Sequence, residues 1–344
     1  MNTLSKRLFS ALSRPIISDY RPVLYNYPSE ASVEVLEPNG SKRVIGSCVR
    51  QLFYKRKSAS HSEERNVDWF LSAQVGNNFC SMLRSMVDEF SFSLGLQIVK
   101  VEHSFFDKEL EISGRTDLLV WDTQLQEMVG VEIKSVGEWK ADKCIEEPHE
   151  EHVLQCMIYL DHYQRHIPKG QLRPNKWYIW YLARVDSWNL KAKKHQSPLT
   201  NLWDFQITLH EKGYPVIHSA VKGAVPWPHI TLDKVYSRFK DLKKYVESGS
   251  EPPRDFDMSY SEEKIAGLHK RGLLTKTNSK VVESWLKKGA KKGSLKLEMG
   301  DFECRACPWK SECWRLPKGH ERQIFDLPRL VEEKVKETSS PEIL

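Results

Sequence analysis

The stretch GRTDLLVWDTQLQEMVGVEIKS, residues 114–135, decides the fold. Apolar and polar residues alternate in two segments that a short polar turn separates, and this period of two predicts two neighbouring strands of one sheet. In MVGVEIKSV the apolar residues, among them Val131 and Ile133, share one face of the strand. Glu132 and Lys134 therefore lie on the opposite face.

Three charged side chains of this stretch could form a divalent-metal site. If the two strands pair, Asp117 of the first and Glu132 of the second converge on one cation, and carboxylate oxygens are ligands that Mg²⁺ and Mn²⁺ prefer. Such an ion polarises a phosphate oxygen and lowers the pKa of a bound water, while Lys134 orients that water or neutralises developing charge. The alternative interpretation is a salt-bridged polar face on a half-buried sheet.

The segments on either side predict an α/β or α+β core, because helical and strand periodicities follow one another along the chain. The Trp- and Tyr-rich segment 177–188 is interpreted as core rather than as a stacking platform. We expect helices at 47–57, 66–95, 149–165 and 231–247, and strands at 97–106, 111–121, 128–136, 176–184 and 203–210.

The predicted helix 149–165 carries two polar residues on one face, since Gln155 and Tyr159 are four positions apart. Together they could contact a phosphate and stack on a base or sugar. The alternative is an ordinary, partly exposed amphipathic helix.

The order GRTDLLV, VEIKS, QCMIY resembles the PD-(D/E)xK nuclease core in its RecB-like branch. The resemblance implies a restriction-endonuclease-like mixed central sheet flanked by helices. It implies Asp117, Glu132 and the Ile133 backbone carbonyl as Mg²⁺ or Mn²⁺ ligands, Asp117, Glu132 and Lys134 as catalytic residues, and Gln155 and Tyr159 as DNA-positioning residues.

One position departs from that family pattern. The family usually has Gly-x-x-x-His on the preceding helix, with the histidine as a further metal ligand. Here the matching stretch is GNNFC, so Gly76 is present and Cys80 stands in the place of the histidine. A thiol suits Mg²⁺ poorly, and Cys80 is expected either to replace the ligand or simply to pack.

A cysteine cluster lies near the end of the chain, with the spacing Cys304-x₂-Cys307-x₅-Cys313. Three cysteines this close predict a metal or cluster site, and Cys48 in CVRQLFY is the candidate fourth ligand. This arrangement resembles the Cas4-like and AddB-like iron–sulfur nucleases, and the resemblance implies a [4Fe–4S] cluster that closes a helical periphery. Zinc, or scattered reduced cysteines, are the alternatives.

Composition narrows the class of protein. The chain has 344 residues, is 40% hydrophobic, and carries a net charge of +6, which permits nucleic-acid binding without requiring it. An odd count of seven cysteines and no apolar run of membrane-span length argue against a secreted disulfide scaffold and a membrane protein. We expect a cytoplasmic or otherwise intracellular protein of a virus or bacterium, with a mitochondrial transit peptide or a nuclear location left open.

The expected organisation is an N-terminal arm (1–40), a nuclease core (41–250), a basic helical insertion (251–300), a cysteine cluster (301–320) and a polar tail (321–344). The lysine run at 286–296 either contacts phosphates or is a solvated face.

The predicted function is a metal-dependent exonuclease acting on DNA ends or single strands in repair, recombination, replication or CRISPR-type processing, with a helicase or recombination partner. An inactive DNA-binding protein on a nuclease scaffold is the alternative, and a structural zinc protein is a third interpretation.

Overall fold

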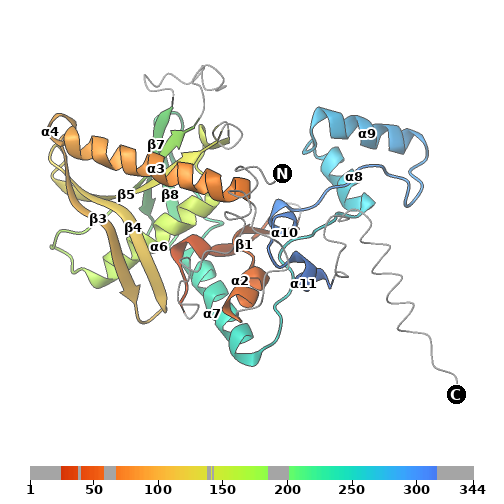
Figure 1. Cartoon of the computed structure of the whole chain (residues 1–344), viewed down its shortest axis with the longest axis horizontal. Coiled ribbons are helices and arrows are strands. Elements are labelled where there is room, and N and C mark those ends of the chain that lie inside the picture. Colours follow the sequence, from red (N-terminus) through yellow and green to blue (C-terminus); the bar gives the residue numbers. More distant parts are fainter. Residues whose placement is uncertain are drawn as a thin grey trace, which may run out of the picture. The chain divides into compact units, whose positions relative to one another are not determined.

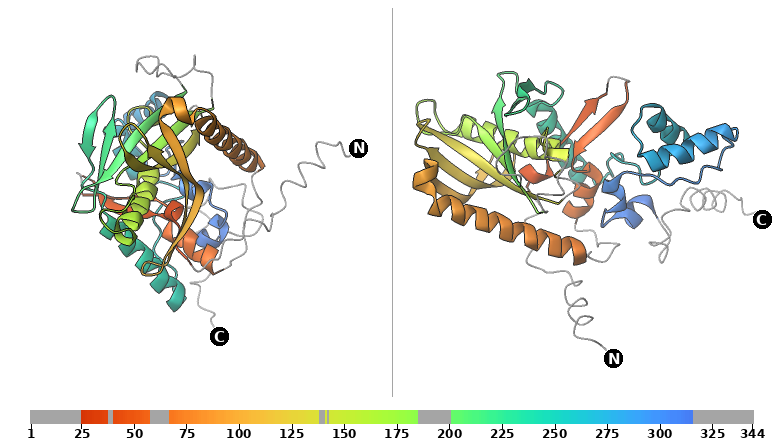
Figure 2. Two further views of the ribbon diagram at one scale, coloured as in Figure 1. Left: turned by 90° about the vertical axis from the view of Figure 1, so that its left-hand side faces the viewer. Right: turned by 90° about the horizontal axis from the view of Figure 1, so that it is seen from above.

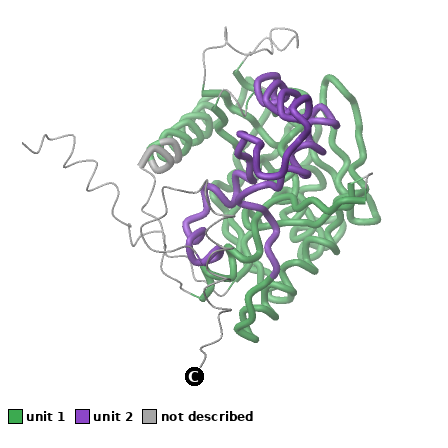
Figure 3. The backbone as a smooth tube through the Cα atoms, turned by 90° about the vertical axis from the view of Figure 1, so that its right-hand side faces the viewer, with its two compact units in different colours: residues 1–58, 65–252 green, residues 59–64, 253–344 purple. Residues whose placement is uncertain are grey.

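The computed structural model describes residues 25–37, 40–57, 67–137, 141, 143–184 and 201–315. The chain divides into two compact units (Figure 3). The first contains residues 1–58 and 65–252, and the second contains residues 59–64 and 253–344. The expected N-terminal arm lies largely, and the polar tail entirely, outside the described residues.

A seven-stranded mixed sheet forms the centre of the first unit (Figure 1). Its strands lie in sequence order, and every neighbouring pair is antiparallel except β5 and β6, which run parallel. That parallel pair requires a crossover, and α6 supplies it. The strands are β3 (Leu96–Asp107), β4 (Ile112–Asp122), β5 (Glu127–Val136), β6 (Trp177–Ala183), β7 (Leu202–Leu209), β8 (Pro215–Ser219) and β9 (Gly223–Pro226).

Two long helices, α3 (Val67–Glu89) and α6 (Glu150–His166), cover opposite faces of this sheet (Figure 2). Alternate residues of β4 and β5 supply the two faces: Leu118 and Val131 pack with Leu83 of α3, whereas Leu119 joins the cluster around α6. The face toward α6 carries the larger core, so α6 is fixed along most of its length.

The other elements of the first unit surround this sandwich. Helix α7 begins at the N-cap Thr231, whose hydroxyl accepts from the Lys234 N–H, and ends at Gly249 with φ of 71°. The remaining elements are β1 (Ser32–Leu36), β2 (Lys42–Gly46), η2 (Pro28–Glu30), α2 (Val49–Arg56), α4 (Ser91–Leu94) and α7 (Leu232–Ser248).

The described part of the second unit, residues 253–315, is helical and has a small core. Its buried apolar residues among 253–315 include Met258, which clusters with Cys304. Its helices are α8 (Glu262–Lys270), α9 (Lys276–Lys287), α10 (Phe302–Arg305) and α11 (Lys310–Trp314).

The predicted fold class is confirmed, since the structure has a mixed sheet flanked by helices. The single helix expected at 66–95 is two helices in the structure. Helix α3 ends at Glu89, and the short helix α4 follows and ends at Gly95, which has a φ of 67°. The hairpins β1–β2 and β8–β9 were not predicted. Within the described part of the chain, no helix is both long and apolar enough to span a membrane.

Candidate active site

Strands β4 and β5 part beside the predicted metal ligands. The pairing of the two strands ends at Leu118 and Val131. Further along β5, the N–H of Ile133 also faces β4, but it donates to Asp117 Oδ2 at 2.8 Å. In a strand the N–H and C=O of one residue point to the same edge. The Ile133 carbonyl therefore faces the same gap as the Asp117 carboxylate.

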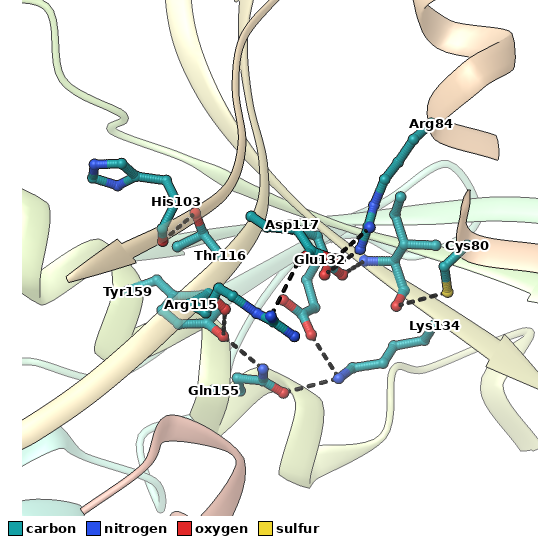
Figure 4. Close-up of polar contacts among 12 residues, drawn as sticks. Cys80, Arg84, His103, Arg115, Thr116, Asp117, Glu132, Lys134, Gln155 and Tyr159 are labelled. Atoms are coloured by element: carbon teal, nitrogen blue, oxygen red, sulfur yellow. Dashed lines mark hydrogen bonds and ion pairs between the residues drawn. The ribbon is translucent and has the colours of Figure 1, made fainter. Parts of the chain in front are cut away.

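A chain of polar contacts links β5 to α6 on the other side of the gap (Figure 4). Lys134 Nζ donates to Glu132 Oε1 at 2.7 Å and to Gln155 Oε1 at 2.9 Å. Gln155 Nε2 donates to the Tyr159 hydroxyl at 2.7 Å, and that hydroxyl donates to the Arg115 carbonyl at 2.9 Å. Gln155 and Tyr159, one helical turn apart, thus bind the Lys134 side chain and the backbone of β4, respectively.

Glu132 is the most unusual group of the site. Its side chain is buried, with one oxygen on Lys134, while Oε2 has no hydrogen-bond partner among the described residues. Burial raises the pKa of Glu132 to about 7, although the Lys134 ammonium opposes the shift. Burial alone would lower the pKa of Lys134, but the Glu132 carboxylate outweighs it and the pKa of the lysine is raised.

Arg84 belongs to the site and was not predicted. Its Nη2 donates to Asp117 Oδ1 at 2.9 Å and its Nη1 donates to Glu102 at 2.7 Å. Arg84 follows Cys80 by four residues, so both lie on one face of α3. This spacing relates Arg84 to Cys80 in the sequence, but only the packing of α3 on the sheet reveals Asp117 as its partner.

The five predicted side chains are thus brought together. Asp117, Glu132 and Lys134 meet at the β4–β5 gap, and α6 adds its two polar residues (Figure 4). A family profile described as the PD-(D/E)XK nuclease superfamily matches residues 34–314.

The chain belongs to the PD-(D/E)XK nuclease superfamily.

Comparison with solved structures returns an alkaline exonuclease, LHK-Exo, from Laribacter hongkongensis, and the same protein in complex with dAMP. In each comparison the identity is 12%, the TM-score is 0.34, and the match covers 58% of this chain and 78% of the other. No curated protein sequence matches this chain.

The residues at the β4–β5 gap fit the divalent cation that the superfamily implies. Two carboxylates and a carbonyl offer hard oxygen donors, and the buried Glu132 Oε2 lacks a partner among the described residues. Soft metals are disfavoured, because the set contains no thiolate or imidazole.

Cys80, the residue that the sequence pattern aligns with the superfamily's usual histidine, lies beside the site. Its Sγ is 3.9 Å from the Ile133 carbonyl oxygen. Burial raises the pKa of the Cys80 thiol, which keeps it protonated near neutral pH. A neutral thiol is a poor ligand for Mg²⁺, and we infer that Cys80 contacts the carbonyl rather than the ion.

The cysteines of the predicted cluster lie on short elements. Cys48 is the N-cap residue of α2 in the first unit. In the second unit Cys304 lies in α10 and Cys313 in α11, while Cys307 follows α10. The four-cysteine cluster stays a prediction.

Proposed function

We propose that the protein is a Mg²⁺- or Mn²⁺-dependent deoxyribonuclease that hydrolyses phosphodiester bonds at DNA ends or in single strands. One observation supports this proposal above the others: the buried Glu132 carboxylate has an oxygen without a partner among the described residues, beside Asp117 and Lys134. Lys134 pairs with Oε1 only, and a buried carboxylate oxygen without a partner is costly, so a metal ion at Oε2 would offset that cost.

Each side chain has a distinct task in this proposal. Asp117, Glu132 and the Ile133 carbonyl hold the ion, which when bound polarises the scissile phosphate and lowers the pKa of an attacking water. Lys134 keeps its charge and faces the developing negative charge on the phosphate. Gln155 fixes the Lys134 ammonium by their hydrogen bond.

Tyr159 acts from inside the protein in this proposal. Its side chain is 1% exposed, and its hydroxyl bonds Gln155 and the Arg115 carbonyl. We therefore propose that it positions DNA through the backbone and side chains that it holds. Arg115, whose side chain is 60% exposed, is free to approach a phosphate if it leaves Glu102, 3.1 Å away.

The test is an end-labelled single strand incubated with Mg²⁺ or Mn²⁺, beside a covalently closed single-stranded circle of the same sequence. We expect the linear strand to be shortened, the circle to survive, and a chelator to stop the reaction. Cleavage of the circle contradicts exonuclease action. A mobility shift without shortening supports the alternative, an inactive DNA-binding protein.

Arg84 is expected to compete with the metal ion for Asp117. Its guanidinium contacts Asp117 Oδ1 at 2.9 Å, so removing its charge leaves the carboxylate more available to a cation. We expect Arg84→Ala to lower the Mn²⁺ concentration for half-maximal binding by about 10-fold, as measured by calorimetric titration.

Arg115→Ala is the matched control for this prediction, since Arg115 pairs with Glu102 and not with the Asp117 side chain. An unchanged or higher Mn²⁺ requirement in the Arg84 variant would show that Arg84 does not compete.

We also propose that Cys48, Cys304, Cys307 and Cys313 hold a [4Fe–4S] cluster, with zinc as the alternative. Their spacing supports this, and so does the small core of the second unit, because units with few buried residues commonly depend on a metal. A helicase or recombination partner, the biological pathway and the cellular compartment stay predictions.

A further inference from the structure

A second group of metal-ligating side chains lies outside the nuclease site, at the other end of α6. Asp107 is the last residue of β3, and His162 and His166 are one helical turn apart on α6. One ligand atom from each lies within 4.8 Å of the others. All three residues belong to the first unit.

The distances suit ligands of a common ion. Asp107 Oδ2 lies 3.2 Å from His166 Nε2 and 3.6 Å from His162 Nδ1. Ligand atoms around tetrahedral zinc are about 3.4 Å apart, given metal–ligand distances of about 2.0–2.2 Å. His162 Nδ1 is buried, and in the described part of the chain it has no partner within hydrogen-bond distance; it points toward Asp107 Oδ2, 3.6 Å away.

The surrounding contacts fix two of the three ligands in place. Asp107 is fully buried, and its Oδ1 accepts from the N–H groups of Glu109 and Leu110, each at 3.0 Å. The His162 ring stacks on Phe105 with centroids 4.0 Å apart.

One cation already contacts the carboxylate. Arg165 Nη2 lies 2.5 Å from Asp107 Oδ2, and the same guanidinium donates through Nε to Asp161 at 2.7 Å. A metal ion need displace only the first of these contacts, because Asp161 retains the arginine. Arg165 therefore lowers the affinity of these three side chains for a metal ion but does not prevent the ion from binding.

We propose that Asp107, His162 and His166 bind a zinc-class divalent cation. Two imidazoles and one carboxylate favour Zn²⁺ or Co²⁺ over Mg²⁺, and three protein ligands leave a fourth position for water. The ion links the end of β3 to the last turns of α6. When bound, it stabilises the folded first unit.

The test uses the full chain with Co²⁺ as an optical probe and Zn²⁺ as its competitor. We expect the visible absorption of tetrahedral Co²⁺, its removal by Zn²⁺, and a higher melting temperature with Zn²⁺. His166→Ala removes a half-exposed ligand, and it should weaken Co²⁺ binding by at least about 100-fold, since even outer-shell losses cost 10- to 100-fold. His229→Ala, at a similarly exposed histidine, should change nothing.

Two further variants make the outcome decisive. Arg165→Gln removes the competing charge and should tighten Co²⁺ binding by at least about 10-fold. Asp117→Ala should leave the absorption of tetrahedral Co²⁺ unchanged, because the oxygen ligands at the β4–β5 gap favour octahedral ions; this separates the group from the nuclease site and from any failure of the proposed nuclease activity. Co²⁺ binding that is insensitive to His166→Ala, or absent from both the natural chain and Arg165→Gln, overturns the proposal.

Discussion

Asp117→Ala and Lys134→Ala are each expected to slow Mg²⁺- or Mn²⁺-dependent DNA hydrolysis by on the order of 1000-fold or more. The first removes a proposed metal ligand and the acceptor of the Ile133 N–H. The second removes the cation that pairs with the buried Glu132 carboxylate. Rates of shortening of a labelled single strand measure both effects.

Folding has to be checked separately, because Lys134→Ala leaves Glu132 without its cation. Far- and near-ultraviolet circular dichroism and the melting temperature serve for this purpose. Asp241→Ala and Lys222→Ala are suitable surface controls, since both side chains form exposed ion pairs away from the gap. Undiminished hydrolysis by both test variants would remove Asp117 and Lys134 from the active site.

Cys304→Ser is expected to prevent binding of the proposed iron–sulfur cluster and to unfold the second unit. Few side chains of this unit are buried in the described range 253–315, so its own packing contributes little. Structural metal sites in small domains contribute about 10–16 kcal/mol, more than the core of such a unit supplies. Iron and sulfide content, visible absorption and limited proteolysis within residues 253–315 measure the two effects.

Cys144→Ala is the matched control, because Cys144 is fully buried in the core of the first unit. It should keep the colour and the iron content while losing some stability to a small cavity. A colourless protein that contains zinc after purification without oxygen would replace the cluster with the zinc alternative. A coloured Cys304→Ser protein would remove Cys304 from the ligand set.

Much of the first unit could be predicted from local pattern. Strand β5 follows from the alternation around Val131 and Ile133, and both faces of the sheet follow from the same period. The hairpin β8–β9 was not predicted, because its strands, Pro215–Ser219 and Gly223–Pro226, are too short to show the alternation of apolar and polar residues. The end of α3 was not predicted because apolar residues recur past Glu89, at Phe90, Phe92 and Leu94.

The site shows the same division between local and tertiary information. Gln155 and Tyr159 could be paired from helical spacing alone. The Arg84–Asp117 contact depends on how α3 packs on the sheet, and no local pattern encodes that geometry. The spacing of His162 and His166 indicates that they share one face of a helix, but Asp107 lies on a strand more than fifty residues earlier in the sequence.

The hydrogen bond from the Ile133 N–H to Asp117 turns one backbone amide into a spectroscopic reporter. The resonance frequency of an amide proton depends on the electron density of its acceptor, and under the proposed metal binding Asp117 would change that density by exchanging Arg84 for a divalent ion. A single cross-peak of a ¹H–¹⁵N spectrum therefore follows metal occupancy in the absence of DNA. Paramagnetic Mn²⁺ broadens that signal before distant ones, which separates ion binding from strand cleavage within one sample.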